Sequence, residues 1–144
     1  MKMIYIAGPL FNENEKVGNL ALSNFLQKAG YTVFLPQNEA GDFSRLAKKY
    51  PLKTKSVREG IFKKDIRALM DSNAVVALLD GRAPDEGTCV EIGFAYAKGI
   101  PVIGYKTDIR CFSQYGENIM LELCLKKICR TKRDLLKTLS NITK

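Results

Sequence analysis

The sequence predicts an α/β fold for residues 1–144 as a single domain, with a flavodoxin-like or Rossmann-like parallel sheet sandwiched between helices. Short apolar segments typical of strands alternate with longer amphipathic segments typical of helices, and no internal repeat is present. The segment from Ala74 to Leu79 is apolar at every position, which indicates a strand buried on both faces. Because helices separate the strands, each connection crosses over, and we expect the strands to be parallel.

The first half of the chain is predicted to contain, in order, a strand at 3–7, a helix at 12–29, a strand at 32–35, a short helix at 43–49 and a helix from 56 to about 70. Gly30 ends the first helix, because glycine readily adopts the left-handed conformation found there. Pro36 ends the second strand. Ser56 and Glu59 have the spacing of a capping box, which predicts a helix start.

The second half is predicted to contain the apolar strand at 74–79, a helix at 88–98, a strand at 101–105, a loop at 107–116 and helices at 118–128 and 132–139. Gly99, with Pro101 just beyond it, ends the first of these helices. Thr131, with Asp134 three residues later, marks the start of the last one.

The chain has no histidine. This excludes Ser-His-Asp and Cys-His catalysis and histidine-based metal sites, so an acid or base must be a carboxylate, tyrosine, lysine or cysteine. No G-x-G-x-x-G motif follows the first strand, where Gly8-Pro9-Leu10-Phe11 stands instead. We therefore expect no dinucleotide cofactor.

The four cysteines show no C-x-x-C spacing, and no targeting segment is recognisable, so we expect reduced thiols and a cytoplasmic protein. No apolar run is long enough to cross a membrane. The net charge is +8, but the basic residues are spread along the chain, without interleaved aromatic residues or an RNP-like motif. We therefore expect no nucleic-acid binding and a basic surface that attracts small anions.

Two carboxylates, Asp85 and Glu91, flank the turn between the apolar strand and the helix after it. Ligands bind at this position in open α/β sheets, and a carboxylate pair is the equipment of glycosidic-bond chemistry, with one nucleophile and one acid. Each residue also has a structural interpretation. Glu91 could complete a capping box with Thr88, and Asp85 could be a turn residue beside Pro84.

Three further residues can be interpreted in two ways. Tyr5, in the first strand, is either a core residue or a phenol that hydrogen-bonds the nucleophilic carboxylate. Asp65, on a predicted helix, is by default an exposed charge. Phe11 is either one wall of a base-stacking slot or an apolar staple onto the first helix.

These residues carry a resemblance to the nucleoside 2-deoxyribosyltransferase family that covers most of the chain. The matching segments are Tyr5 to Phe11, Pro36-Gln37, Ile61 to Met70, Asp71 to Asp80, Asp85 to Ala95 and Asn118-Ile119-Met120. The Asp-x5-Glu-x-Gly element after a buried strand is specific in combination with the first-strand tyrosine and the late Asn-x-Met.

The resemblance implies an enzyme that exchanges the base of a 2′-deoxyribonucleoside through a covalent deoxyribosyl-enzyme, with retained stereochemistry. Glu91 matches the family's nucleophile, and Tyr5 matches the phenol that positions it. Asp85 and Asp65 match the acidic residues near the departing base. The resemblance also implies that neither a metal nor an organic cofactor is needed.

Substrate-binding residues are implied as well. Gln37 matches a contact to the base edge. Asn118 matches a residue that a neighbouring subunit lends to the 5′-hydroxyl of the sugar, which implies a homo-oligomer, a dimer or a multiple of dimers, with a shared active site. Its small-molecule partners would be a deoxynucleoside and an acceptor base. The other residues expected beside the substrate are Gly8, Pro9, Phe11, Gly87 and Met120.

Two other functions are left open. The same fold family includes N-glycosidases that hydrolyse deoxynucleoside 5′-monophosphates, typically with a phosphate cradle rich in serine and arginine, whereas residues 8–12 contain neither a hydroxyl nor an arginine. The basic excess still leaves room for a nucleotide, because lysine or arginine side chains elsewhere can reach a phosphate. A non-catalytic module that senses nucleotides is the second alternative.

Overall fold

The computed structural model describes residues 1–39, 46, 48–50 and 54–143. One parallel sheet lies at its centre, with its strands in the order β2-β1-β3-β4-β5. These strands are β1 (Met3–Ala7), β2 (Thr32–Phe34), β3 (Ala74–Leu78), β4 (Val102–Tyr105) and β5 (Lys127–Cys129). This is the strand order of flavodoxin-like folds, so the predicted fold class is confirmed.

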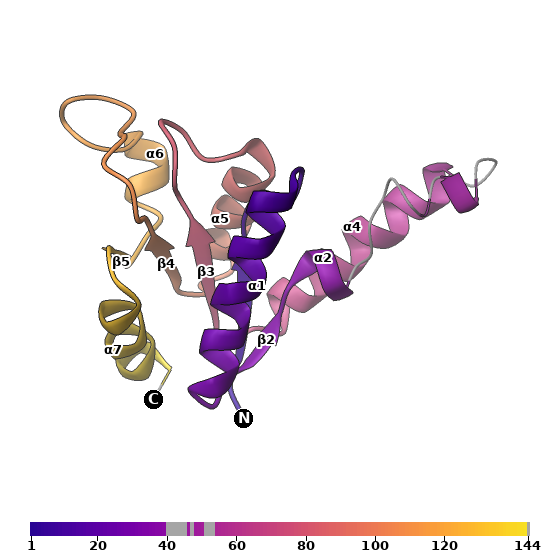
Figure 1. The fold of residues 1–144 in the computed structure, drawn as a ribbon, viewed down its shortest axis with the longest axis horizontal. Coiled ribbons are helices and arrows are strands. Elements are labelled where there is room, and N and C mark those ends of the chain that lie inside the picture. Colours follow the sequence, from indigo (N-terminus) through magenta and orange to yellow (C-terminus); the bar gives the residue numbers. More distant parts are fainter. Residues whose placement is uncertain (40–45, 47, 51–53, 144) are drawn as a thin grey trace.

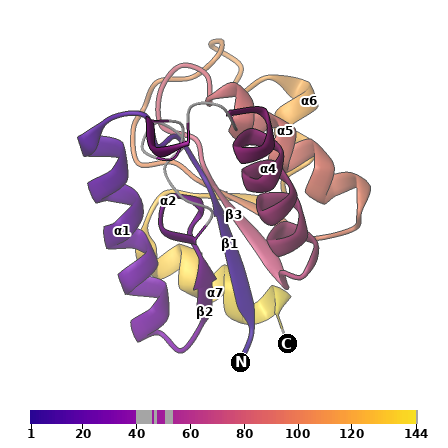
Figure 2. The same ribbon diagram turned by 90° about the vertical axis from the view of Figure 1, so that its right-hand side faces the viewer.

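Helices cover both faces of the sheet (Figure 1). They are α1 (Glu13–Lys28), α2 (Pro36–Glu39), α4 (Thr54–Met70), α5 (Glu86–Ala97), α6 (Ile119–Glu122) and α7 (Lys132–Ile142). Side chains of α1 and α7 pack in a core on one face, and those of α4, α5 and α6 pack in a core on the other. Figure 2 shows α1 on one side of the sheet and α4, α5 and α6 on the opposite side.

The interior strand β1 contributes alternate side chains to the two cores. Ile4 and Ile6 face the core under α1 and α7, whereas Tyr5 and Ala7 face the core under α4 and α5. β1 pairs with β3, with Ile4 opposite Ala74. The chain runs from β1 toward β2 on one side and from β3 toward β4 on the other. The carboxyl ends of β1 and β3 therefore form the switch point where such folds bind ligands.

The predicted helix at 118–128 is wrong beyond its first turn. α6 is a single turn, and β5 follows as an edge strand, where Lys126 N donates to Val102 O. Leu121, Leu125 and Ile128 happen to have helical spacing in the sequence. All three pack in the same core, although they come from different elements. Periodicity alone could not separate a helical turn and a three-residue strand from one continuous helix.

Two predicted helix starts also differ from the structure. α4 already includes Thr54, so Ser56 lies inside the helix and does not mark its start. α5 begins two residues earlier than predicted, because Asp85 is its N-cap. The roles of Gly30, which has φ +92°, and of Thr131, the N-cap of α7, are confirmed. The short helix predicted at 43–49 falls for the most part outside the described residues.

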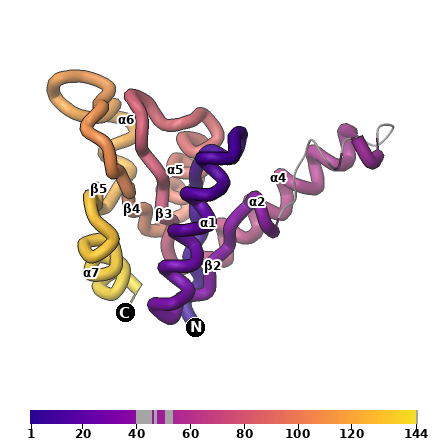
Figure 3. Tube along the Cα trace, in the orientation of Figure 1, coloured from indigo at the N-terminus to yellow at the C-terminus, as the bar shows by residue number. Residues whose placement is uncertain are grey.

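The N-terminal part of α4 extends away from the body of the domain (Figure 3). Ala68 and Leu69, near the other end of this helix, are buried in the core, whereas Phe62 is 62 % exposed. This part of α4 therefore presents an apolar side chain that the described residues leave largely exposed.

Candidate active site

Tyr5 and Glu91, 86 residues apart in the sequence, are joined by a hydrogen bond in which the Tyr5 hydroxyl donates to Glu91 Oε1 at 2.5 Å. Tyr5 is fully buried in β1, and its ring stacks on Phe34 of β2 with 5.5 Å between the ring centroids. This packing fixes the ring and directs the phenol toward α5. The two interpretations of Tyr5 are therefore compatible, since it is both a core residue and the partner of the Glu91 carboxylate.

Glu91 lies inside α5, and its carboxylate faces Tyr5 instead of the start of the helix. Asp85 is the N-cap of α5, so the capping box between Thr88 and Glu91 is not formed. Burial raises the pKa of Glu91 from 4.5 to about 7, and the negative charges of Asp65 and Asp85 add to the rise, while the hydrogen bond from Tyr5 lowers it. Glu91 can therefore be found both ionised and protonated near neutral pH.

The phenol of Tyr5 stays protonated across the physiological range. Burial, together with the charges of Glu91 and Asp65, raises the pKa of Tyr5 far above its usual value. Tyr5 is consequently a permanent hydrogen-bond donor to Glu91 and does not act as a base.

Asp65 is not the exposed charge that its position on a helix suggested. It is half-buried on α4, and its Oδ1 is buried without a hydrogen-bond partner among the described residues. Burial raises the pKa of Asp65 to about 6, although Lys64 lowers it. Asp65 also raises the pKa of both Tyr5 and Glu91, which places the three groups close together. A buried carboxylate oxygen without a partner is costly and is typical of functional sites.

Asp85 begins α5. Its carboxylate accepts hydrogen bonds from Gly87 N at 3.2 Å, from Thr88 N at 2.8 Å and from Thr88 Oγ1 at 2.6 Å. The turn interpretation of Asp85 is therefore confirmed, and Gly87 forms part of this turn. Because Asp85 still raises the pKa of Glu91, the carboxylate also lies within electrostatic reach of the candidate nucleophile.

The loop after β1 packs tightly on β3. A Cβ atom on Gly8 would lie 2.7 Å from Leu78 Cδ1, so this turn approaches β3 more closely than a residue with a side chain could without a shift. Pro9 and Asp85 line a cavity of about 480 Å³ beside α1. Phe11 is 76 % exposed, so it does not form the predicted staple onto α1.

Gln37 is predicted to contact the base, but its side chain already makes two hydrogen bonds within the chain. Its Oε1 accepts a hydrogen bond from Asn19 Nδ2 at 3.0 Å, and its Nε2 donates to Lys16 O at 3.0 Å. These bonds join the start of α2 to α1. A contact of Gln37 with a base stays a prediction, and it would require one of these bonds to be exchanged.

Asn118 and Met120 lie on the far side of α5 from Glu91. Both line a cavity of about 460 Å³ together with Cys89 and Gly93. Cys89 and Gly93 are each two residues from Glu91, and positions two apart on an α-helix point about 160° away from each other. The structure therefore does not bring Asn118 to the Glu91 of its own chain.

Asn118 is the N-cap of α6. Its Oδ1 accepts a hydrogen bond from Met120 N at 2.9 Å, so its Nδ2 group is the part that can donate to another molecule. Met120 is exposed, as are Ile119 and Leu123. This short helix therefore exposes three apolar side chains on the surface of the molecule.

Sequence reasoning missed Lys106, a fully buried lysine directly after β4. Its position, one residue beyond the strand predicted at 101–105, carries no local signal of burial. In the described ranges 1–39, 46, 48–50 and 54–143, no three His, Cys, Asp or Glu side chains come together as a metal site requires, and no helix is long and apolar enough to cross a membrane.

The sequence matches one family model, and the fold matches several solved structures. The family model described as nucleoside 2-deoxyribosyltransferase matches residues 4–135. A 2-deoxyribosyltransferase from Bacillus psychrosaccharolyticus superposes with a TM-score of 0.75 and 23% identity, covering 93% of this chain and 90% of that one. A conserved protein from Enterococcus faecalis V583 superposes with a TM-score of 0.76 and 26% identity, covering 98% of each chain.

A more distant similarity is to a CMP N-glycosidase from Clostridium botulinum, with a TM-score of 0.54 and 20% identity, covering 96% of this chain and 99% of that one. At such identity the likeness shows a shared fold and says nothing of the substrate. A comparison with curated proteins gave no match.

Proposed function

Because this chain belongs to the nucleoside 2-deoxyribosyltransferase family, we propose that it exchanges the base of a 2′-deoxyribonucleoside for a second base through a covalent deoxyribosyl-enzyme. The observation that carries the proposal is the contact between Glu91 and Tyr5, with Asp65 beside it. A buried carboxylate held by a neutral phenol, next to a second carboxyl group with a raised pKa, is suited to double displacement at a glycosidic carbon.

In the first displacement, a carboxylate oxygen of Glu91 attacks C1′ of the nucleoside while the bond from C1′ to the base nitrogen breaks and its electron pair leaves with the base. Asp65 gives its proton to that base. In the second displacement, a nitrogen of the acceptor base attacks C1′, Asp65 takes back a proton, and Glu91 leaves as a carboxylate. Each displacement inverts C1′, so the product retains the original configuration.

The roles of the two carboxylate oxygens of Glu91 follow from the hydrogen bond. Tyr5 binds Oε1, which leaves Oε2 as the attacking oxygen. Attack requires the ionised form, and the bond from Tyr5 favours this form by lowering the pKa of Glu91.

We assign the proton to Asp65 and not to Asp85. The pKa of Asp65 is raised to about 6, so Asp65 retains a proton more readily than an ordinary carboxyl group does. Its buried Oδ1 is also without a hydrogen-bond partner among the described residues, so a bond from a base would displace no existing one. Asp85 already accepts three hydrogen bonds within the first turn of α5, which suits a residue that orients the base.

We also propose that the enzyme is a homo-oligomer in which Asn118 completes the active site of a neighbouring subunit. Asn118 lies on the opposite side of α5 from Glu91, so it can serve a site of this kind only on another chain. The helices on this face expose several large apolar side chains, which a second subunit would cover: Phe62, Met70, Val90, Tyr96, Ile119, Met120 and Leu123.

The preferred substrate is a free deoxynucleoside. Several basic side chains beyond the end of β4 and β5 are committed to carboxylates or carbonyls: Lys106 to Glu117, Arg110 to Asp108, and Arg130 to the backbone of Asp108. One observation favours the hydrolase alternative, because Arg82 is exposed three residues before Asp85 and could meet a 5′-phosphate.

One incubation tests the function. Thymidine or deoxyinosine is supplied with and without adenine, and products are separated by chromatography. Base exchange requires new deoxyadenosine to appear only with adenine. Release of free base without an acceptor would favour the hydrolase, and intact nucleoside in every reaction would favour a binding module and overturn the proposal.

A further inference from the structure

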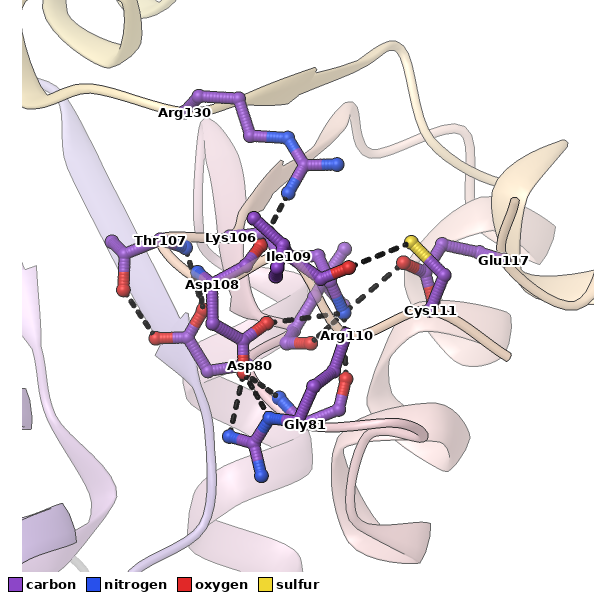
Figure 4. Close-up of polar contacts among 11 residues, drawn as sticks. Asp80, Gly81, Lys106, Thr107, Asp108, Ile109, Arg110, Cys111, Glu117 and Arg130 are labelled. Atoms are coloured by element: carbon purple, nitrogen blue, oxygen red, sulfur yellow. Dashed lines mark hydrogen bonds and ion pairs between the residues drawn. The ribbon is translucent and has the colours of Figure 1, made fainter. Parts of the chain in front are cut away.

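Lys106 is a buried lysine that the reaction proposed above does not use. Its ammonium group donates to Leu79 O at 2.7 Å and to Gly81 O at 2.8 Å, and it pairs with Glu117 Oε1 at 3.0 Å (Figure 4). A buried ammonium costs several kcal/mol unless it is paired and hydrogen-bonded. Two backbone carbonyls and one carboxylate therefore surround the ammonium group, so its charge is compensated inside the fold.

The acceptors of Lys106 belong to two different loops. Leu79 and Gly81 lie in the loop at 79–85, which ends at Asp85, the N-cap of α5. Glu117 lies in the loop at 106–118, directly before Asn118, the N-cap of α6. Lys106 therefore connects the segment that positions Asp85 to the segment that positions Asn118.

The same two loops are joined a second time around Asp80 and Asp108. Asp80 accepts hydrogen bonds from Thr107 N, Thr107 Oγ1 and Asp108 N, and Asp108 Oδ2 accepts one from Gly81 N at 2.9 Å (Figure 4). Arg110 pairs with Asp108 at 2.6 Å. These contacts hold the loop ends together near the surface, whereas the ion pair of Lys106 holds them in the interior.

Glu117 depends on Lys106 for its position. Its side chain is 3% exposed, and neither of its oxygens accepts a hydrogen bond within the part of the chain that the structure describes, so its contact with Lys106 is an ion pair. It also lines the cavity that Asn118 and Met120 line. Without the ammonium of Lys106, this buried carboxylate would lose its compensating charge and would move toward solvent.

We propose that Lys106 is a positioning residue. By holding Glu117 in place, it positions Asn118 to contact the 5′-hydroxyl of a nucleoside bound by a neighbouring subunit. This inference rests on the proposed function. It predicts that recognition of the 5′-hydroxyl depends on an ion pair that touches neither substrate nor reacting atoms.

The test uses two substrates and an apolar replacement of the ion pair. Replacing a buried ion pair by apolar side chains of similar size often leaves stability unchanged or higher, so Lys106→Met with Glu117→Leu is the variant of choice. The readout is the ratio of kcat/KM for 2′-deoxyadenosine to that for 2′,5′-dideoxyadenosine, which lacks the 5′-hydroxyl. The matched control removes the exposed pair of Lys127 and Asp134, as Lys127→Met with Asp134→Asn.

We expect the Lys106/Glu117 double variant to unfold in a single cooperative transition. Its ratio of kcat/KM for the two substrates should fall at least about tenfold, the scale of one lost hydrogen bond in a buried site. The control should keep the wild-type ratio. Adding Asn118→Ala should lower the ratio in the wild type and change it little in the double variant, since both changes would remove one interaction. If the double variant does not fold, Glu117→Gln, which keeps the side-chain shape, gives the same test. The expected fall in the kcat/KM ratio is then smaller.

A folded double variant with the wild-type ratio, or an undiminished effect of Asn118→Ala in its background, would overturn the role of Lys106. These results leave the proposed reaction intact, because they concern selectivity among substrates that are still turned over. A wild-type protein that leaves deoxyadenosine intact with every acceptor base would instead remove the proposed function, and the inference with it.

Discussion

The Tyr5 hydroxyl donates a 2.5 Å hydrogen bond to Glu91, and this bond holds one oxygen of a helical carboxylate against β1, an interior strand of the sheet. The partners reach each other because β1 and β3 pair in parallel, and α5 follows directly after β3. The position and the protonation of the Glu91 carboxylate both depend on this contact.

Replacing Glu91 by Gln removes the proposed nucleophile while keeping the shape and a hydrogen-bond acceptor for Tyr5. We expect a folded protein whose base-exchange rate falls at least about a thousandfold, because the covalent route is lost. Steady-state kinetics measure the loss, with Glu86→Gln, an exposed position on the same helix, as the control. Near-normal turnover by the Glu91 variant would show that this carboxylate is not the nucleophile.

Replacing Tyr5 by Phe removes the donor and keeps the stacked ring. Because the bond from Tyr5 lowers the pKa of Glu91, its loss should raise that pKa above about 7. The rising limb of kcat/KM against pH should then move to higher pH, and the plateau should fall about tenfold or more, the scale of a hydrogen bond to a charged group. A pH-rate profile of the variant that overlies that of the wild type would contradict this coupling.

Glu91 should also reduce stability in alkaline solution. Its pKa is about 7 in the native protein and 4.5 when unperturbed, so the native state binds the proton more tightly, and stability is lost as the pH rises from about 4.5 through 7. Glu91→Gln should therefore be more stable than the wild type by up to about 3 kcal/mol at about pH 8, with no difference below about pH 4.5. Urea unfolding at the two pH values measures this, and a difference that does not vary with pH would exclude the linkage.

Subunit mixing tests the shared site. Glu91→Gln should be nearly inactive alone, and Asn118→Ala should keep about a tenth of the wild-type kcat/KM, the scale of one lost hydrogen bond. In a mixed dimer, one site would combine both defects and the other would contain neither, so an equal mixture should recover about a quarter of the wild-type activity. The variants are mixed under subunit exchange and assayed, and light scattering gives the mass. A fully active monomer, or no recovery in hybrids, would count decisively against Asn118 acting across an interface.

Substrate charge separates the transferase from the hydrolase. The loop at 8–12 offers no hydroxyl or cationic side chain to a phosphate, which must lose its hydration to bind. We expect kcat/KM for deoxyadenosine to exceed that for its 5′-monophosphate at fixed ionic strength, with adenine release assayed in parallel. Preference for the monophosphate, with base released and no acceptor needed, would place the protein among the hydrolases, and Arg82→Gln should then weaken that preference.

The strands at the centre of the sheet could be predicted because burial on both faces leaves a strong local signal. β1 and β3 were predicted to within one residue, since their runs are almost entirely apolar. β5 was missed because it has only three residues at the edge of the sheet, of which only Cys129 is fully buried. So short a segment shows no alternation of apolar and polar residues that would distinguish a strand from a helix.

The candidate site was less accessible to sequence reasoning. The local spacing of Asp85 and Glu91 indicated a site, but the contact of Glu91 with Tyr5 depends on strand pairing, and only the family resemblance joined the two. The burial of Asp65 follows from the packing of α4, which no local pattern encodes. Lys106 was missed because its partners come from two separate loops, so nothing next to it in the sequence marks it as buried.

The interior position of β1, which pairs on both edges, has a consequence for synthesis of the chain. β1 leaves the ribosome before the other strands, but the strand that pairs with its second edge, β3, begins only at Ala74. Until that segment has emerged, Ile4 and Ile6 belong to a strand with one open edge, which can pair with other nascent or truncated chains. Fragments that stop before β3 should therefore aggregate, and folding of this domain must wait until more than half of it has been made.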